Sequence, residues 1–383
     1  FLNIWRLFIF RRSHNGVQMS SHIRLPPESF RTPLHLTVLV NNNQTPLFKH
    51  HLQLGAKMAD FAGWEMPILY NGIIAEHKAV RERVGIFDVS HMGQIFITGP
   101  DTVAFLSYVT TWDMKRQKDS DCRYCHILDN DGRIIDDIIA YTFTSEEYMV
   151  IPNAATIDTI LSWLLENSGD FDVHIKNLSN DYFCIALQGP EAPRLLGQHL
   201  NTSVKPFRLA RERNTIVSGT GYTGEEGCEI IGPSEEVKGH WESLVDMGAE
   251  PVGLGARDTL RLEKGYLLSG QDFDGTQTTL ETNYSWVIDW DHEFIGKPAL
   301  ISQKNRTYAK LKGIMLDERG VLRPGLPVFY NGNEISSLTS GSMSPTIRKG
   351  IGLAYLNLPI NSRVTVEVRG NHLNGHVVRL PFL

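Results

Sequence analysis

The sequence predicts an α+β protein with two related α+β subdomains and a C-terminal β-barrel domain. Three observations indicate this class. The 383 residues, of which 42% are hydrophobic, suffice for two or three domains with separate cores. Helical and strand-like patterns mix up to about residue 305, and two stretches there resemble each other. From about residue 309 the chain consists of short alternating runs broken by glycine, as in a small barrel.

The first 44 residues differ in composition from the rest. They carry five arginines against one acid, Glu28, and begin with the apolar stretch FLNIWRLFIFRR. An Arg-rich, acid-poor segment is typical of a mitochondrial transit peptide, so we expect a leader at residues 1–44 and a location in the mitochondrial matrix. The alternative is an untranslated leader with the true start at Met19.

Charge and composition exclude several classes of function. The chain carries −6, and because the leader contributes +4, the remainder carries −10. Such an acidic part, without a basic run, argues against nucleic acid as the main partner. No run of eighteen apolar residues predicts a membrane span. The four cysteines suggest buried free thiols, because the CRYC pair lacks further metal ligands; we expect no metal.

The first elements follow from periodicity and punctuation. A helix from about residue 46 is stopped by Gly55, and a Gly/Pro-rich loop follows it. A second helix is expected at 73–84. FDVSHMGQIFITGP predicts a strand with its loop, and DTVAFLSYVT predicts a helix with Asp101 as its N-cap.

Two similar stretches of sequence suggest that the two subdomains are related. ITGPDTVAFL (97–106) and LQGPEAPRLL (187–196) share a strand end, a Gly-Pro turn, an acid and a helix start. Two strand–turn–helix units of this kind suit a pair of similar subdomains. The alternative is chance similarity around a Gly-Pro turn.

The stretch LDNDGRIIDDIIAY places two carboxylates side by side in an Ile-rich strand. The residues DNDG predict a hairpin turn between CRYCHIL and RIIDDIIAY, and a symmetric turn puts Tyr124 opposite Asp137. Alternation places Asp137 and Tyr141 on one face, which suits a pocket for an aromatic, partly cationic molecule. Asp136 falls on the other face without comparable neighbours. The alternative is a solvent-exposed edge strand. An error of one residue in the strand register would also exchange the faces on which the two aspartates lie.

Two further segments suggest a ligand site. In SGTGYTGEEGCEII, glycines surround Tyr222 and Glu229 enters an apolar strand, although a hairpin turn with an exposed acid is the alternative. GLGARDTLRLEKGY predicts a turn into a helix with Arg257 and Arg261 on one face. The third Gly of a dinucleotide fingerprint is replaced by Asp258. Arg257 suits ligand carboxylates, and helix-surface ion pairs are the alternative.

The last segment predicts a separate domain. KLKGIMLD, GIGLAYL and SRVTVEVRGNHLNGHVV alternate as strands do, and NGN predicts a hairpin turn. We expect the boundary in ISQKNRTYAK, which gives domains at 45–305 and 306–383.

Seven motifs in order resemble the aminomethyltransferase (T-protein) family of the glycine cleavage system: FAGWEMP, FDVSHMG, DGRIIDDIIAY, NAA, QGP, GYTGEEGCE and GLGARDTLRLEKG. The resemblance runs from about Thr45 to the C-terminus. It implies a three-lobed cloverleaf with folate in a central channel. It also implies transfer of a methylene group from the lipoate arm of H-protein to tetrahydrofolate, with release of ammonia. The decarboxylase and the dihydrolipoyl dehydrogenase of the system would be further partners.

The resemblance also implies site residues, motif by motif. Asp137 corresponds to the essential aspartate of the family. The positions that match its folate-lining residues are Met92, Tyr124, Tyr141, Asn153, Tyr222, Glu229, Arg257 and Tyr266. A carboxylate in a pocket of low dielectric can accept a folate proton and stabilise a developing positive charge. Glu229 would pair with pterin N–H groups, and Arg257 with the glutamate tail of the folate or with the closing of the channel.

Two other functions are the alternatives. KGYLLSGQD resembles the signature of non-catalytic folate-binding paralogues that act in iron–sulfur cluster assembly, but Tyr266 stands where that signature has Cys. The folate half of an oxidative demethylase would need a flavin domain, for which the chain has no nucleotide fingerprint. We therefore expect the transferase.

Overall fold

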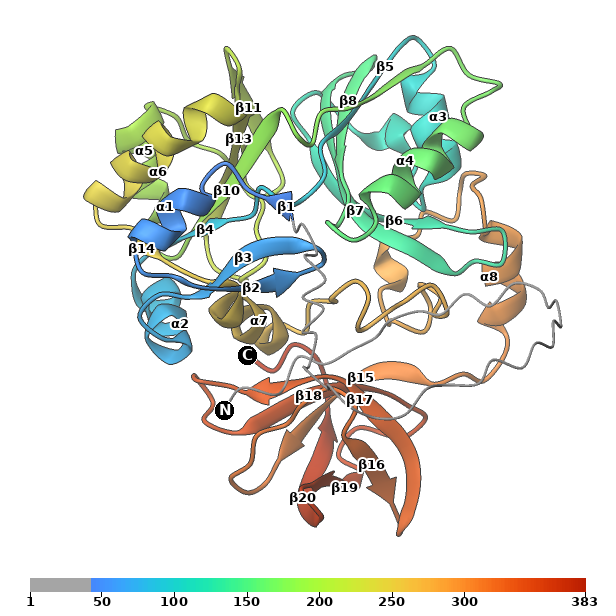
Figure 1. The fold of residues 1–383 in the computed structure, drawn as a ribbon. Coiled ribbons are helices and arrows are strands. Elements are labelled where there is room, and N and C mark those ends of the chain that lie inside the picture. Colours follow the sequence, from blue (N-terminus) through green and yellow to red (C-terminus); the bar gives the residue numbers. More distant parts are fainter. Residues whose placement is uncertain (1–42) are drawn as a thin grey trace, which may run out of the picture. The chain divides into compact units, whose positions relative to one another are not determined.

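The computed structural model describes residues 43–383. The expected leader lies outside the described residues except for its last two, which form a short strand. The described residues form two α+β lobes, a hairpin sheet and a closed barrel (Figure 1). The hairpin sheet has the order β1-β3-β2 and consists of β1 (Asn43–Gln44), β2 (Lys57–Phe61) and β3 (Trp64–Leu69).

The first lobe contains a six-stranded sheet in the order β11-β12-β13-β10-β4-β14. Its strands are β4 (Gly85–Asp88), β10 (Tyr182–Gln188), β11 (Leu209–Glu212), β12 (Thr215–Ser218), β13 (Gly227–Pro233) and β14 (Glu250–Pro251). Three helices cover one face: α1 (Phe48–Gln53), α5 (Ala192–Leu200) and α6 (Val237–Asp246) (Figure 1). Buried Trp241 and Leu195 from these helices pack against Ile86, Ile185 and Ile230 of the sheet.

The second lobe contains a five-stranded sheet in the order β6-β7-β8-β5-β9. Its strands are β5 (Ile95–Thr98), β6 (Cys122–Leu128), β7 (Ile134–Thr144), β8 (Glu147–Ile151) and β9 (His174–Asn177). The helices α3 (Thr102–Val109) and α4 (Ile157–Glu166) pack on one face through Phe105 and Leu164. The opposite face contributes Phe96, Tyr141 and Met149 to a central core that also contains residues of the first lobe.

The two lobes repeat one topology, which confirms the predicted repeat. The order β5-α3-β6-β7-β8-α4 in the second lobe corresponds to β10-α5-β11-β12-β13-α6 in the first. Both turns use a glycine with positive φ, 135° at Gly99 and 129° at Gly189. A Cβ there would lie 2.3 Å from the carbonyl oxygen of Asp172 and 2.5 Å from that of Arg83, so only glycine fits.

The remaining helices connect the lobes to the barrel. They are α2 (Ile73–Glu82), α7 (Leu254–Glu263), α8 (Lys297–Lys304) and the short 3-10 helices η1 (Met114–Arg116), η2 (Ser234–Glu236) and η3 (Ser285–Val287). The barrel closes in the order β15-β18-β17-β16-β19-β20. Its strands are β15 (Lys310–Leu316), β16 (Pro327–Tyr330), β17 (Asn333–Met343), β18 (Gly350–Leu356), β19 (Arg363–Val368) and β20 (Asn371–Val378). This confirms the predicted fold class and the hairpin turn at Asn331–Gly332, where both φ angles are positive.

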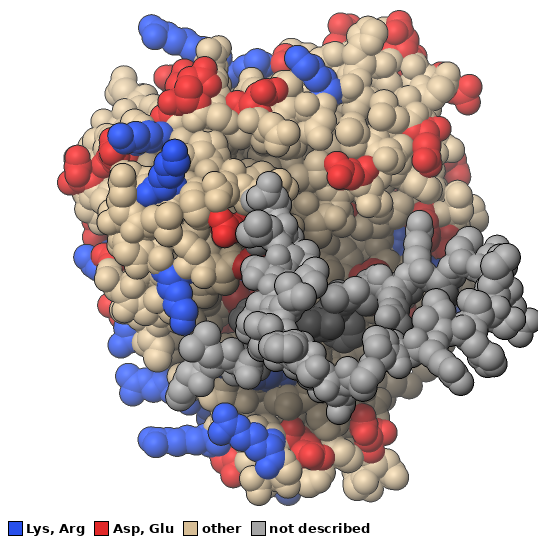
Figure 2. Space-filling model, in the orientation of Figure 1, with Lys and Arg blue, Asp and Glu red and all other residues tan. Residues whose placement is uncertain are grey.

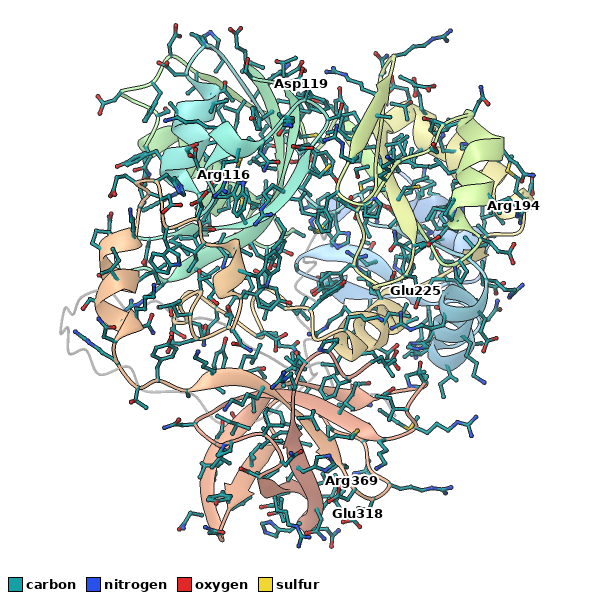
Figure 3. The ribbon with its side chains drawn as sticks, turned by 180° about the vertical axis from the view of Figure 1, so that it is seen from behind. Arg116, Asp119, Arg194, Glu225, Glu318 and Arg369 are labelled. Atoms are coloured by element: carbon teal, nitrogen blue, oxygen red, sulfur yellow. The ribbon has the colours of Figure 1, made fainter. Side chains whose placement is uncertain are left out.

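Buried Glu263 connects α2, α7 and the barrel. Its carboxylate accepts hydrogen bonds from Arg81 at 2.8 Å and from Ser344 of the barrel. Burial opposes its ionisation, but hydrogen bonds from His77 and Ser344 hold the pKa of Glu263 at about 2. Arg81 also donates to Glu225 at 2.8 Å, and Glu225 lies beside α7 in Figure 3.

Two local predictions were wrong. The expected Gly/Pro-rich loop after α1 is the β2–β3 hairpin, whose turn residues Ala62 and Gly63 have φ of 53° and 79°. Alanine seldom occupies a left-handed position, so the turn was hidden in the sequence. Asp101 precedes α3 as expected, but its side chain does not cap the helix. It accepts a hydrogen bond from the backbone N–H of Asp172 instead.

One face of the molecule carries both acidic and basic side chains. In Figure 2 the acidic ones occur on both sides of the view, and the basic ones lie mostly on its left. Within residues 43–383, no helix is long and apolar enough to cross a bilayer. The same residues contain no group of three His, Cys, Asp or Glu side chains placed to hold a metal ion. All four cysteines are buried and free, as predicted.

Candidate active site between the two lobes

The β6–β7 hairpin has a different register from the predicted one. Tyr124 lies opposite Ile139, and His126 lies opposite Asp137. The prediction that Tyr124 faces Asp137 directly was therefore wrong by two residues. The loop spans the five residues 129–133, whereas the prediction assumed a loop of two or four. The pairing is also irregular next to the loop, between Ile127 and Leu128.

The shift by two residues leaves the faces of β7 unchanged, because side chains alternate with a period of two. Ile135, Asp137 and Ile139 are half-buried, whereas Asp136 and Ile138 on the other face are buried. Thus Asp137 lies on the predicted face.

Tyr124 reaches Asp137 as a diagonal neighbour across the two strands. Its hydroxyl donates a hydrogen bond to Asp137 Oδ2 at 2.7 Å. Burial and the negative charge of Asp137 raise the pKa of Tyr124, so its hydroxyl keeps the proton that it donates.

Asn153, after β8, bridges the two aspartates. Its Nδ2 lies 2.6 Å from Asp137 Oδ1 and 2.8 Å from Asp136 Oδ1. Asp136 is completely buried, and the Asn153 backbone N–H, the Thr156 hydroxyl and the Ser269 hydroxyl also lie within hydrogen-bond distance of it. The prediction that Asp136 has no comparable polar neighbours was therefore wrong. Ser269 is 133 positions away in the chain, a separation that no local pattern reveals.

The two carboxylates influence each other's ionisation. Burial, together with the charge of Asp137, raises the pKa of Asp136 to about 7. Burial also raises the pKa of Asp137, although hydrogen bonds from Tyr124 and Asn153 oppose this. Like charges this close titrate as a pair, so the pair retains a proton to higher pH than an isolated aspartate would.

Glu229, on β13, is the second carboxylate of the site and comes from the first lobe. Its Oε2 accepts hydrogen bonds from Tyr141 at 3.2 Å and from Thr220. The Tyr141 hydroxyl also lies 2.8 Å from Ser218 Oγ, so Tyr141 of the second lobe is held by three groups of the first. Among the described residues, no side chain or backbone group donates to Glu229 Oε1. That oxygen can therefore accept from a ligand.

Arg257, in the first turn of α7, lies beside Tyr222. Its guanidinium is 4.7 Å from the centroid of the Tyr222 ring, which in turn lies 5.8 Å from the ring of Tyr266. Arg257 Nη1 is buried and has no hydrogen-bond partner among residues 43–383. Burial lowers the pKa of Arg257, and the charge of Glu229 opposes that effect. A buried N–H without a partner is costly, so this atom fits a ligand acceptor.

Arg261 does not share this role, although it lies on the same helix. Its guanidinium is buried between Asp258 and Asp272, each 2.8 Å away. The ion pair within the helix, which was the alternative to ligand binding in the sequence analysis, is therefore present between Arg261 and Asp258. Arg257 makes no ion pair with a described residue.

An aromatic wall beside Asp137 was missed from the sequence. The ring of Trp286 stacks on Tyr124 at 5.7 Å and 26°, and Tyr284 lies 5.9 Å from Tyr124. Trp286 is 54% exposed, which is unusual for so large an apolar side chain. Both residues belong to NYSWVIDW, whose aromatic content is a signal but whose position beside β6 depends on the tertiary fold. Met92 is half-buried against the central core.

Tyr222 of the first lobe lies close enough to Asp137 of the second lobe to be influenced by its charge. Burial raises the pKa of Tyr222; Arg261 opposes this, and the charge of Asp137 in the second lobe raises it further. The arrangement therefore offers the carboxylate of Asp137, a second carboxylate at Glu229, a guanidinium atom of Arg257 without a partner among the described residues, and aromatic walls. It suits a flat ligand whose edge carries both donors and an acceptor.

A separate small cavity contains none of the predicted site residues. It has a volume of about 160 Å³ and is lined by Gln44, Pro46, Trp64, Ser90, Ser179, Asn180, Tyr182 and Ser234. Its lining contains no carboxylate or cation, so we assign it no chemistry.

Comparisons with known proteins identify the family and agree with the fold. The family model described as the GCVT N-terminal domain matches residues 47–292, and the glycine cleavage T-protein C-terminal barrel domain matches residues 310–383. A solved structure of glycine cleavage system aminomethyltransferase T from Bartonella henselae superimposes with a TM-score of 0.85 at 30% identity. The match covers 89% of this chain and 98% of that one.

Curated relatives point the same way. An aminomethyltransferase from Pseudothermotoga lettingae is 40% identical over 88% of this chain and 97% of its own length. One from Halothermothrix orenii is 38% identical over 89% and 99%. These relatives are bacterial, and the mitochondrial location stays a prediction. The family matches over both parts of the chain, together with these relatives, show that the chain belongs to the aminomethyltransferase (T-protein) family of the glycine cleavage system.

Proposed function

We propose that the protein transfers the methylene carbon of an aminomethyl group from the lipoate of H-protein to tetrahydrofolate and releases ammonia. The observation that carries the proposal is the half-buried carboxylate of Asp137 on β7. Hydrogen bonds from Tyr124 and Asn153 hold this carboxylate in place. A fixed carboxylate with a raised pKa in a site of low dielectric suits both proton transfer and the stabilisation of a cation.

The residues present fit a reduced pterin. Adjacent N–H groups of such a ring can donate to Glu229, whose Oε1 accepts from no described residue. A ring oxygen can accept from Arg257 Nη1, which also lacks a partner among the described residues. The rings of Tyr124 and Trp286 offer a face for the aromatic part of a folate.

The overall transfer loses two folate N–H protons, one to the lipoyl sulfur and one to the departing amine. Asp137 can hold the first of these N–H groups and take up its proton transiently, while its charge stabilises the positive charge that develops on nitrogen. Tyr124 and Asn153 fix the orientation of the carboxylate through one hydrogen bond to each oxygen. H-protein, which carries the lipoate, is the partner that this reaction requires.

The direct test supplies aminomethylated H-protein and tetrahydrofolate to the purified protein and measures ammonia. We expect release of ammonia that depends on both substrates. A non-catalytic folate-binding paralogue would bind tetrahydrofolate, as followed by calorimetry, and release none. Folate binding without ammonia would therefore overturn the transferase in favour of that alternative.

Arg257→Lys is expected to raise the KM for tetrahydrofolate. Lysine keeps the positive charge but cannot present the planar fork of donors, and it packs less well on the ring of Tyr222. We expect a rise of about tenfold, the equivalent of one good hydrogen bond to a charged group. Initial rates at saturating H-protein measure it, with Arg194→Lys on the exposed face of α5 as the control. An unchanged KM would contradict contact between Arg257 and the folate.

A further inference from the structure

The two adjacent aspartates of β7 share one amide group but differ in their other partners. Asn153 Nδ2 donates to both carboxylates, at 2.8 Å to Asp136 Oδ1 and 2.6 Å to Asp137 Oδ1. The second oxygen of Asp137 receives the hydroxyl of Tyr124. The second oxygen of Asp136 lies 2.6 Å from the hydroxyl of Thr156. The two hydroxyl groups, of Tyr124 and Thr156, differ in how readily each can turn and accept a proton from the carboxyl group beside it.

The hydroxyl of Thr156 has another place for its own hydrogen. It lies 3.0 Å from the backbone oxygen of Asn153 and 2.6 Å from Asp136 Oδ2, and it has one hydrogen to donate. If that hydrogen goes to the Asn153 oxygen, Thr156 Oγ1 can accept a proton from Asp136. Both short contacts then become satisfied hydrogen bonds, and the buried carboxyl carries no charge.

Among residues 43–383, no hydroxyl group next to Asp137 offers an equally good arrangement for accepting a proton from it. Tyr124 would have to accept from Asp137 and send its own hydrogen to His126 Nε2, which lies 3.4 Å away. A contact of that length is weak. Burial lowers the pKa of His126 to about 3, so its imidazole is neutral and offers no charge in exchange.

We propose that Asp136 carries the proton that the aspartate pair retains, and thereby keeps Asp137 ionised toward the substrate. Asp136 is then a positioning residue that acts through Asn153, and this role in transfer rests on the function proposed above. The location of the proton is a property of the free protein and can be tested without substrate.

The other groups around the pair do not supply a competing charge of opposite sign. Neither aspartate forms an ion pair with a described Lys or Arg. The titratable groups that face the pair from neighbouring elements are Tyr124 and His126 of β6, Tyr222 of the first lobe, Asp272 after α7 and Tyr284 just before η3. Asp272 is a further acid; its charge raises the pKa of Asp137, and Arg261 pairs with it at 2.8 Å.

The first test locates the proton by infrared spectroscopy of the free protein at neutral pH. A protonated carboxyl gives a C=O stretch that a carboxylate lacks. We expect this band in the unaltered protein and in neither Asp136→Asn nor the Asp136→Asn/Asp137→Asn double variant. A band that persists in Asp136→Asn and disappears in Asp137→Asn would place the proton on Asp137 and overturn the proposal. Absence of the band from the unaltered protein would also overturn it.

The second test uses stability against pH. A carboxyl whose pKa is raised in the folded state stabilises the fold fully below its unfolded pKa, and this contribution is lost as pH rises through the folded pKa, here about 7. The amide that Asp136→Asn introduces cannot titrate. The Tm of Asp136→Asn relative to the unaltered protein is therefore expected to rise by about 2–5 °C between pH 5.5 and pH 8.5.

The matched control is Asp289→Asn, a buried aspartate outside the pair. Burial opposes ionisation of Asp289, but the hydrogen bond from Arg116 lowers its pKa, so its contribution is constant between pH 5.5 and pH 8.5. The Tm difference for this variant should not change over that range. A constant difference for Asp136→Asn as well would mean that Asp136 has only a structural role.

Activity separates this inference from the proposed function. In Asp136→Asn the amide can donate to Thr156, as the protonated acid would, so transfer at neutral pH should stay within about tenfold of the original rate. If the unaltered protein releases no ammonia, the proposed function is overturned, but the infrared result on the location of the proton still holds. A loss in Asp136→Asn as large as in Asp137→Asn would overturn the assignment of roles.

Discussion

Asp137→Asn is expected to lower the rate of methylene transfer by about two to four orders of magnitude, the range that a positioned general base contributes. The amide keeps the shape of the carboxylate, whose oxygens lie 2.7 Å from the Tyr124 hydroxyl and 2.6 Å from Asn153 Nδ2. Its oxygen can accept from Asn153, and its NH2 group can donate to the hydroxyl oxygen of Tyr124. It can neither take up a proton nor offset a positive charge. Ammonia release under saturating substrates measures the change, and circular dichroism verifies the fold.

The pH dependence of the reaction gives an independent view of the same group. A base works above its pKa, so transfer should fall as the solution becomes more acidic. Because burial raises the pKa of Asp137, this fall should begin at a higher pH than for an exposed aspartate. The fall should be absent from the residual activity of Asp137→Asn. If that variant keeps the original rate, another group is the base.

Arg261→Met is expected to cost about 3–5 kcal/mol in the free energy of unfolding, because it leaves a buried acid without its partner. Arg261 is 1% exposed and donates to Asp272 at 2.8 Å and to Ser340 of the barrel at 2.7 Å. Asp272 is completely buried and keeps only neutral donors once the guanidinium is gone. Urea unfolding followed by tryptophan fluorescence measures the loss.

The control is Arg194→Met on the first lobe. Its guanidinium is half-exposed, pairs with Glu191 and lies on the outer side of α5 in Figure 3. Removing such a surface pair should change the free energy of unfolding by no more than about 0.5 kcal/mol. Equal losses from the two variants would show that the pair between Arg261 and Asp272 adds nothing beyond a surface contact.

The face of Asp137 could be predicted from the sequence, but its exact neighbour could not. Alternation along β7 depends only on backbone geometry, so it placed Asp137 on the right face even though the predicted register was wrong by two. Register depends on the length and bulges of the turn, and DNDG does not reveal that the loop extends from 129 to 133.

Contacts made by distant segments explain the remaining misses. Asp136 gains partners from Thr156 and Ser269, and Trp286 reaches Tyr124 through a segment with no regular periodicity. Arg257 and Arg261 illustrate the same limit. Both are arginines on one helix, yet Arg257 lies beside Tyr222, whereas Arg261 donates a hydrogen bond to Ser340 of the barrel. Helical spacing cannot distinguish these environments.

The repeated topology of the two lobes has a consequence for how such a site can exist. Two identical subunits around a twofold axis would present the same residue from each side of their interface. Here β7 contributes Asp137, whereas β12, its counterpart in the first lobe, has the sequence TIVS and no acid. Because the two lobes are parts of one chain, each can carry its own residues, so that one lobe supplies Asp137, the proposed base, and the other supplies Glu229. Asymmetric chemistry thus arises from a nearly symmetric pair.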